Sequence, residues 1–84
     1  MTSFQWFVEE LVKAKIKRED AIKLTNDIIG AGPDWDIELD EKDPDAMQEM
    51  RQIFDSSTTF IYKWLRRNFY PGRITNQFRG KIGN

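Results

Sequence analysis

The sequence contains neither cysteine nor histidine. Without cysteine the chain can form no disulfide and no thiolate metal site, and nothing marks it for an oxidising compartment. Without histidine, no imidazole can activate the hydroxyls of residues 56–59, and only hard oxygen ligands remain for a metal. We therefore expect a protein that is not an enzyme and that holds no cofactor and no metal.

Long apolar runs and leader segments are also missing. No stretch approaches the roughly 18 apolar residues of a membrane-spanning helix. The first residues, MTSFQWFVEE, include no basic region of the kind that begins a signal peptide. We therefore expect a cytoplasmic protein with no membrane contact. The length of 84 residues suffices for one domain, so we predict a single helical domain over 1–84.

Two partial motifs lack the residues on which their chemistry depends. The stretch GAGPD has no lysine of the kind that a phosphate-binding loop requires. Asp34, Asp36 and Glu38 alternate as the first ligands of a calcium loop do, but Leu39 stands where that loop needs glycine for its sharp turn. Neither motif predicts a ligand site.

Apolar spacing predicts three helices. Apolar residues at 4, 7, 8, 11 and 12 share one helical face and predict a helix over about 3–14, which a capping box between Thr2 and Gln5 would begin. A second face predicts a helix over about 18–29, with Gly30 as its left-handed cap. Asp43 and Pro44 are a typical helix start, and they predict a long helix over about 44–68.

The long helix crosses SSTT at 56–59, which is poor helix-forming material. The apolar period nevertheless continues without a slip from Met47 through Ile61 to Trp64. This continuity favours one helix, bent at the hydroxyl-rich stretch, and two separate helices remain the alternative.

These elements predict an all-α fold, a small three-helix domain in which a helical hairpin packs on one long helix. An irregular acidic connector spans 31–43, and a basic tail spans 71–84, either frayed or docked through one helical turn. The predicted core is the apolar face of the three helices: Phe4, Phe7, Val8, Leu11, Leu24, Ile28, Met50, Ile53, Phe54, Ile61, Trp64 and Leu65.

The net charge of −1 conceals a strong separation of charge along the chain. Residues 34–49 hold eight acids and one base, whereas residues 63–84 hold six bases and no acid. Such asymmetry bears on partners more than on fold. We define the acidic strip as Asp34, Trp35, Asp36, Glu38, Asp40 and Glu41. We define the basic end as Lys63, Arg66, Arg67, Arg73, Arg79 and Lys81. Both are predicted binding surfaces.

The acidic connector allows three structures. Acids and apolar residues alternate in DWDIELD as they do in a strand, but no second strand is apparent to pair with it. The alternatives are an extended crossover held by Trp35 and Leu39, a short helix, and an exposed docking segment. The burial of Trp35, Ile37 and Leu39 decides between them.

The pattern favours a non-enzymatic interaction protein, an adaptor or inhibitor that acts through protein–protein contacts. Head-to-tail self-association is allowed by the separated charges. One alternative is a nucleic-acid-binding accessory or transcription factor, because the basic end interleaves cations with aromatic rings. Another alternative is a virion or assembly component.

Residues 7–22, FVEELVKAKIKREDAI, resemble the helical segment of bacteriophage late-transcription coactivators. The resemblance covers under a quarter of the chain. The acidic and apolar C-terminal tail that binds the clamp in that family has no counterpart here, because this end is basic. The resemblance implies a phage-encoded or mobile-element accessory protein and assigns no site residues.

Overall fold

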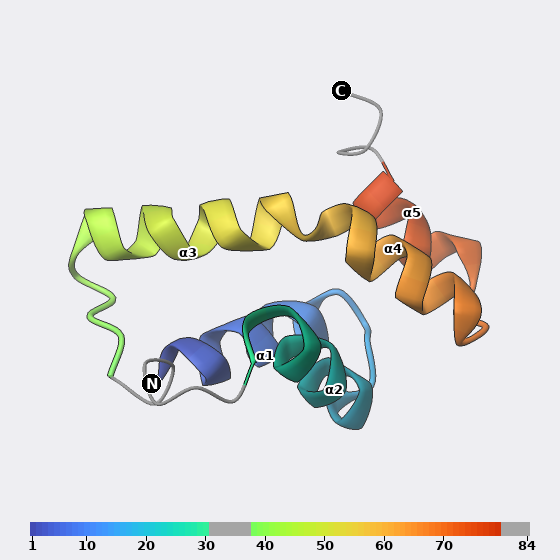
Figure 1. Cartoon of the computed structure of the whole chain (residues 1–84), viewed down its shortest axis with the longest axis horizontal. Coiled ribbons are helices and arrows are strands. Elements are labelled where there is room, and N and C mark those ends of the chain that lie inside the picture. Colours follow the sequence, from blue (N-terminus) through green and yellow to red (C-terminus); the bar gives the residue numbers. More distant parts are fainter. Residues whose placement is uncertain (31–37, 80–84) are drawn as a thin grey trace.

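The computed structural model of the protein describes residues 1–30 and 38–79. Within them the chain forms five helices and no strand: α1 (Ser3–Lys13), α2 (Arg18–Ile29), α3 (Pro44–Ser56), α4 (Thr58–Arg67) and α5 (Gly72–Arg79). Helix α1 packs on α2 and α4 packs on α5, so two helical hairpins are joined through α3 (Figure 1). The all-α class is confirmed, and the three-helix arrangement was wrong. None of these helices is long and apolar enough to cross a membrane.

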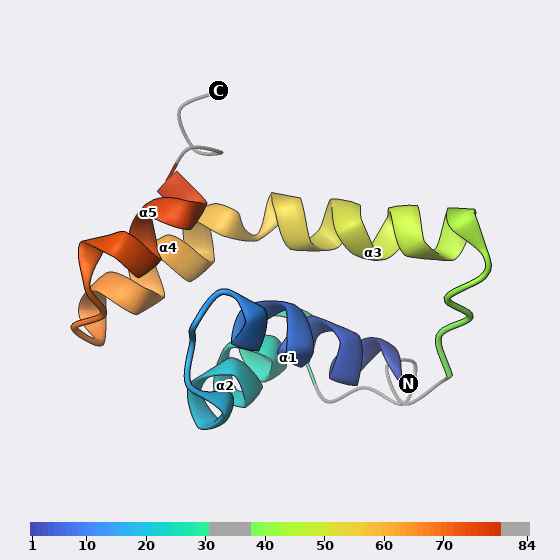
Figure 2. The same cartoon turned by 180° about the vertical axis from the view of Figure 1, so that it is seen from behind.

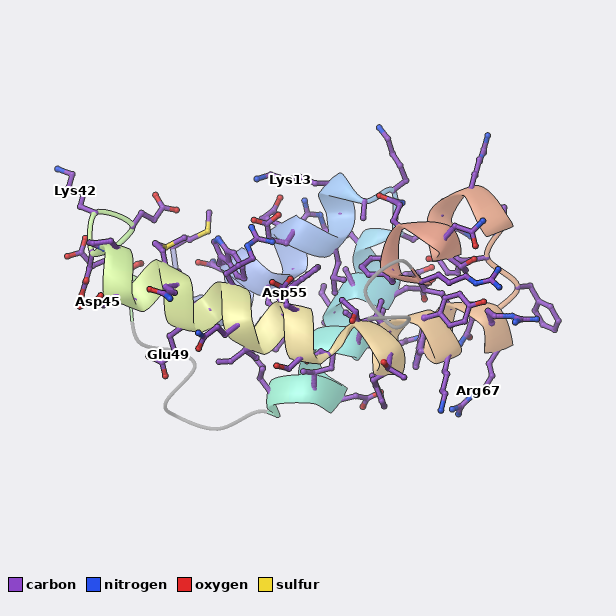
Figure 3. All side chains as sticks on the ribbon, turned by 90° about the horizontal axis from the view of Figure 1, so that it is seen from above. Lys13, Lys42, Asp45, Glu49, Asp55 and Arg67 are labelled. Atoms are coloured by element: carbon purple, nitrogen blue, oxygen red, sulfur yellow. The ribbon has the colours of Figure 1, made fainter. Side chains whose placement is uncertain are left out.

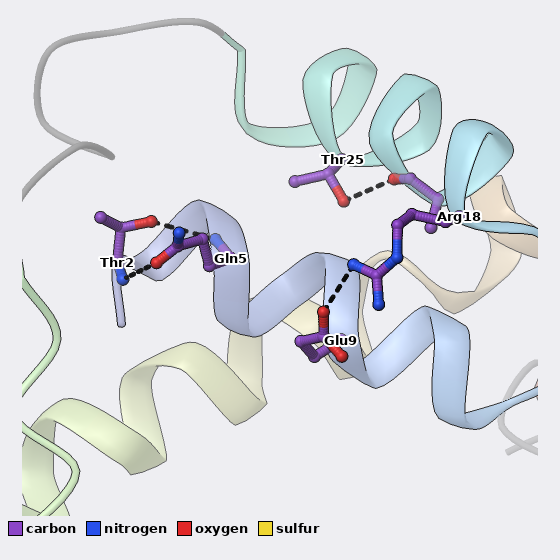
Figure 4. A network of polar contacts seen from close by, with 6 residues as sticks. Thr2, Gln5, Glu9, Arg18 and Thr25 are labelled. Atoms are coloured by element: carbon purple, nitrogen blue, oxygen red, sulfur yellow. Dashed lines mark hydrogen bonds and ion pairs between the residues drawn. The ribbon is translucent and has the colours of Figure 1, made fainter.

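Helix α1 begins at the predicted capping box. The Thr2 hydroxyl accepts the N–H of Gln5 at 3.1 Å, and the Gln5 side chain accepts the N–H of Thr2 at 2.8 Å (Figure 4). Both bonds satisfy N–H groups that have no partner inside the helix. The first turn of α1 is therefore determined by residues next to one another in the sequence.

Replacing Thr2 with alanine is expected to lower the free energy of unfolding by about 1 kcal/mol, because the cap loses its hydroxyl acceptor. Urea denaturation followed by circular dichroism measures this change. Ser3→Ala is the matched control, since it removes a neighbouring hydroxyl that makes no bond in the capping box. Equal losses in the two variants would contradict a capping role for Thr2.

The α1–α2 hairpin turns without glycine or proline. The N–H of Ile16 donates to the carbonyl of Leu11 at 3.2 Å, and the N–H of Lys15 donates to the carbonyl of Val12 at 3.0 Å. This pair of bonds is the Schellman motif, in which the residue after the cap takes a left-handed conformation. Lys15 takes it here, with φ 75°.

The helix predicted over 44–68 is broken into α3 and α4 at Ser57. The Ser57 hydroxyl donates to the carbonyl of Ile53 at 2.8 Å, and the Thr58 hydroxyl donates to the carbonyl of Asp55 at 3.0 Å. Hydroxyls that bind backbone carbonyls in this way compete with the helical ladder and bend helices. The chain changes direction between α3 and α4 (Figure 2). The prediction of one continuous helix was wrong for this reason.

The centre of the core is an aromatic cluster around Phe54 of α3. Its ring lies 5.2 Å from that of Phe7, 6.3 Å from that of Trp6 and 6.2 Å from that of Phe78. The guanidinium of Arg51 lies 5.2 Å from the centroid of the Trp6 ring. Phe54 therefore joins three helices, since Phe7 and Trp6 belong to α1 and Phe78 to α5.

Most of the predicted core residues are buried: Phe7, Val8, Leu11, Leu24, Met50, Phe54, Ile61 and Leu65. Four others are half-buried and pack against that core: Phe4, Ile28, Ile53 and Trp64. The structure also buries five apolar residues that were not in the predicted core: Trp6, Ile16, Ala21, Ile74 and Phe78. Ile74 and Phe78 are buried because the segment predicted as a basic tail forms α5, so the docked alternative is correct within residues 72–79.

Polar contacts link the two hairpins. The Tyr70 hydroxyl, in the loop between α4 and α5, accepts the N–H of Lys17 at 3.1 Å and donates to the carboxylate of Asp20. The side-chain amide of Gln77 donates to the carbonyl of Ala14 at 2.8 Å. These bonds hold the second hairpin against the start of α2 and the end of α1.

The described part of the connector, residues 38–43, lies largely exposed. Leu39 is half-buried, and its N–H donates to the carbonyl of Met1 at 2.8 Å. The predicted start of α3 is confirmed, because the Asp43 carboxylate accepts the N–H of Asp45 at 3.0 Å and Pro44 is the first helical residue. The half-buried Leu39 favours the crossover alternative, in which the connector is held against the helices. Trp35 and Ile37 lie outside the described residues.

Candidate partner-binding site at the basic end

The separation of charge along the sequence is also a separation in space. Lys42, Asp45 and Glu49 lie around the beginning of α3, and Arg67 lies toward the opposite end of the molecule, at the end of α4 (Figure 3). Of the acidic strip, the structure describes three members, which are all exposed: Glu38, Asp40 and Glu41. The other three lie outside the described residues: Asp34, Trp35 and Asp36.

The basic end is assembled from two helices. Its exposed cations come from α4 and α5: Lys63, Arg66, Arg67, Arg73 and Arg79. Lys81 lies outside the described residues. The ion pairs formed among the described residues all lie elsewhere, on Met1, Arg18 and Arg51. The cations of α4 and α5 thus form no ion pair with another described residue.

Phe69 is the most exposed large apolar side chain of the described residues, at 94% of its surface. It follows α4 in a second Schellman motif, in which Tyr70 N–H donates to the Leu65 carbonyl at 3.0 Å and Phe69 N–H to the Arg66 carbonyl at 3.2 Å. Its φ of 63° is left-handed, a conformation that glycine adopts freely and that costs another residue about 1–2 kcal/mol. An exposed ring held at such a cost points to a role outside the fold.

A polar groove of about 340 Å³ lies between α4 and α5. Its lining residues are Tyr62, Arg66, Tyr70, Gly72, Thr75, Asn76 and Arg79. The carbon of the Arg66 guanidinium lies 5.7 Å from the centroid of the Tyr62 ring, and its Nη1 donates to the Tyr62 hydroxyl at 3.3 Å. Of the predicted basic residues, the groove brings Arg66 and Arg79 together, and Arg67 and Arg73 are not among its lining residues.

A second, mainly apolar groove of about 470 Å³ lies along α1 and α2, where Met1, Phe4, Val8 and Ile22 line it. The ion pair of Arg18 and Glu9, 2.6 Å between Nη1 and Oε1, also borders this groove (Figure 4). The hydrogen bond from Arg18 lowers the pKa of Glu9. This ion pair ties α1 to the start of α2.

Sequence reasoning missed the groove and the position of Phe69. Phe69 comes directly before Tyr70, which Pro71 and Gly72 follow. Because Pro71 and Gly72 signal the end of a helix, they could have predicted that Phe69 takes the left-handed position after α4. The groove had no comparable signal, because Arg66 and Arg79 line one groove only when α5 folds back on α4.

Comparisons with protein-family models, with curated proteins and with solved structures found no match to this chain. Residues 7–22, which resemble the phage coactivator segment, form the α1–α2 turn and its flanking helices. No family is therefore assigned. Within residues 1–30 and 38–79, no group of three or more acids is placed to hold a metal ion.

Proposed function

We propose that the protein is a non-enzymatic interaction protein, an adaptor or inhibitor, that binds an acidic protein partner through its basic end. The observation that carries this proposal is Phe69, an exposed ring in a strained conformation close in the chain to Arg66, Arg67 and Arg73. Aromatic side chains and arginine are the residues most enriched at binding hot spots. The partner surface that suits this end is an apolar pocket with acids around it.

The charge of the whole chain supports a protein partner over a nucleic acid. Domains that bind nucleic acid are usually strongly basic, whereas this chain has a net charge of −1. The acids of the connector and of the first turns of α3 would repel a long phosphate backbone. A single protruding ring also fits a pocket better than it fits a row of stacked bases.

A nucleic-acid-binding accessory factor is the second candidate. The cations of α4 and α5 and the stacking of Arg66 on Tyr62 favour it. This function requires retention on DNA or RNA that falls steeply with salt and that is lost in Arg66→Ala/Arg67→Ala.

The acidic end offers a second contact. Glu38, Asp40 and Glu41 are exposed, and the acids at the start of α3 extend their negative surface. This surface suits the basic region of a second partner or the basic end of another copy of the chain, which would join molecules head to tail. A virion or assembly role would show itself as large particles in light scattering.

Phe69→Gly is expected to weaken partner binding at least tenfold while raising the free energy of unfolding by about 1 kcal/mol. The loss follows from removal of an anchoring ring. The gain in stability follows because glycine adopts the left-handed conformation without the steric cost that phenylalanine bears. Glycine loses more conformational entropy on folding, which reduces this gain. The measurements are capture of a host protein on the immobilised full chain, with and without nuclease, and urea denaturation of the free chain.

Lys15→Gly is the matched control. Lys15 occupies the same left-handed position in the other hairpin, with φ 75°, so this variant should gain similar stability and keep its partner. Undiminished capture by Phe69→Gly would refute Phe69 as the anchor. Capture that disappears on nuclease treatment would transfer the function to the second candidate.

A further inference from the structure

We infer that the groove between α4 and α5 is a binding site for a phosphate monoester group. The site goes beyond the proposed function, because it requires neither Phe69 nor a protein partner. It is the polar groove of about 340 Å³ whose lining residues include Arg66 and Arg79.

The residues that line the groove favour an anionic ligand. Arg66 and Arg79 contribute two permanent positive charges, and Asn76 contributes a side-chain amide. No carboxylate occurs among the described residues that line the groove. Neither Arg66 nor Arg79 forms an ion pair with another described residue, which leaves both charges for a ligand. Guanidinium also matches the geometry of phosphate oxygens.

Existing hydrogen bonds decide which lining groups are free to act. The Tyr70 hydroxyl already donates to Asp20, and the Thr75 hydroxyl donates to the Gly72 carbonyl at 3.3 Å, so both form walls of the groove. The Tyr62 hydroxyl accepts from Arg66 and keeps its own hydrogen for donation. Stacking on Tyr62 also holds the Arg66 guanidinium in place before any ligand arrives.

The residues that line the groove offer more hydrogen-bond donors than one carboxylate group can accept from. Arg66 and Arg79 each offer several N–H groups, and Tyr62 and Asn76 add a hydroxyl and an amide. A carboxylate has one negative charge and two oxygens, whereas a phosphate monoester carries about −1.5 to −2 near pH 7 and has three terminal oxygens. The monoester therefore matches two cations and several donors better than a carboxylate or a phosphodiester, which has a single charge.

The test is a titration of the full chain followed by NMR at constant ionic strength, with four probes. Inorganic phosphate and O-phosphoserine represent the free and the side-chain source of the group. Acetate and dimethyl phosphate represent a carboxylate and a phosphodiester. We expect saturable shifts of the Gly72 N–H and of the Asn76 side-chain amide with the first two probes. Binding of acetate and dimethyl phosphate should be at least tenfold weaker.

Arg66→Gln and Arg79→Gln should each weaken phosphate binding at least fivefold. Arg67→Gln is the matched control, because it removes the same charge from the same end but does not line the groove. It should change the affinity less than twofold. Binding should strengthen as the pH rises from 5 to 7, because the second phosphate pKa lies near 6. Amide spectra that superimpose away from the groove verify that each variant is folded.

Three results would overturn the site. Equal weakening by Arg67→Gln and Arg66→Gln would show diffuse attraction to the basic end instead of a defined groove. Equal affinity for dimethyl phosphate would show a site for the nucleic-acid backbone. Shifts that rise linearly without saturation up to about 50 mM phosphate would show that no site is formed.

Discussion

Phe54→Ala should destabilise the protein by about 3–5 kcal/mol, because it empties the point where three helices meet. The Phe54 ring lies 5.2 Å from that of Phe7 in α1 and 6.2 Å from that of Phe78 in α5. A domain of this size has a total stability of roughly 4–13 kcal/mol, so the variant should be largely unfolded or close to its midpoint at 37 °C. Guanidinium denaturation followed by tryptophan fluorescence measures the loss.

Phe60→Ala is the control for Phe54→Ala. Phe60 is also an aromatic residue of the α3–α4 region, but 44% of its surface is exposed. Its truncation should cost less than about 1 kcal/mol, since little packing is lost. A similarly small loss in Phe54→Ala would mean that the aromatic cluster does not hold the two hairpins together.

Tyr70→Phe should lower the free energy of unfolding by about 2 kcal/mol at neutral pH. The Asp20 carboxylate would lose a donor and the N–H of Lys17 an acceptor, and a bond to a charged group contributes about 1.5–3 kcal/mol. Tyr62→Phe is the control, because the Tyr62 hydroxyl meets only Arg66 among the described residues and at the longer distance of 3.3 Å. We expect less than about 0.5 kcal/mol for it.

The contribution of Tyr70 should also depend on pH. Desolvation by burial and the hydrogen bond to Asp20 raise the pKa of Tyr70 to about 12, against 10.0 for an unperturbed tyrosine. The folded state thus favours the neutral phenol, so the stabilisation is complete below pH 10 and is lost as the pH rises through 12. The difference in stability between wild type and Tyr70→Phe should narrow between pH 10 and 12. A constant difference would contradict this coupling.

The starts of α1 and α3 could be read from neighbouring residues. The capping box of Thr2 and Gln5 and the cap of Asp43 before Pro44 depend on hydrogen bonds across two or three positions, and the structure shows them as predicted. The apolar faces could also be read from residues three or four positions apart, and they predicted most of the residues that are buried in the core. The all-α class followed from these local signals.

The break at Ser57 could not be read in the same way. The apolar period from Met50 to Leu65 is the same for one helix and for two, because both keep their apolar face toward the core. The structure places hydroxyl bonds to the carbonyls of Ile53 and Asp55 at the break. Serine and threonine can form such bonds in a straight helix as well, so their presence in the sequence did not predict the break. The bend sends α4 away from the axis of α3, and with it the basic end.

The sequence by itself determined the composition of the candidate site, namely a cationic and aromatic end remote in the chain from an acidic stretch. Only the tertiary structure decided which of these residues act together. Arg66 and Arg79 share a groove because α5 folds back on α4 and buries Ile74 and Phe78, whereas Phe69 is left at 94% exposure in the turn between them. Charge and helical period are properties of neighbours along the chain, but a groove and a protruding ring arise from contacts between segments, which composition and period do not specify.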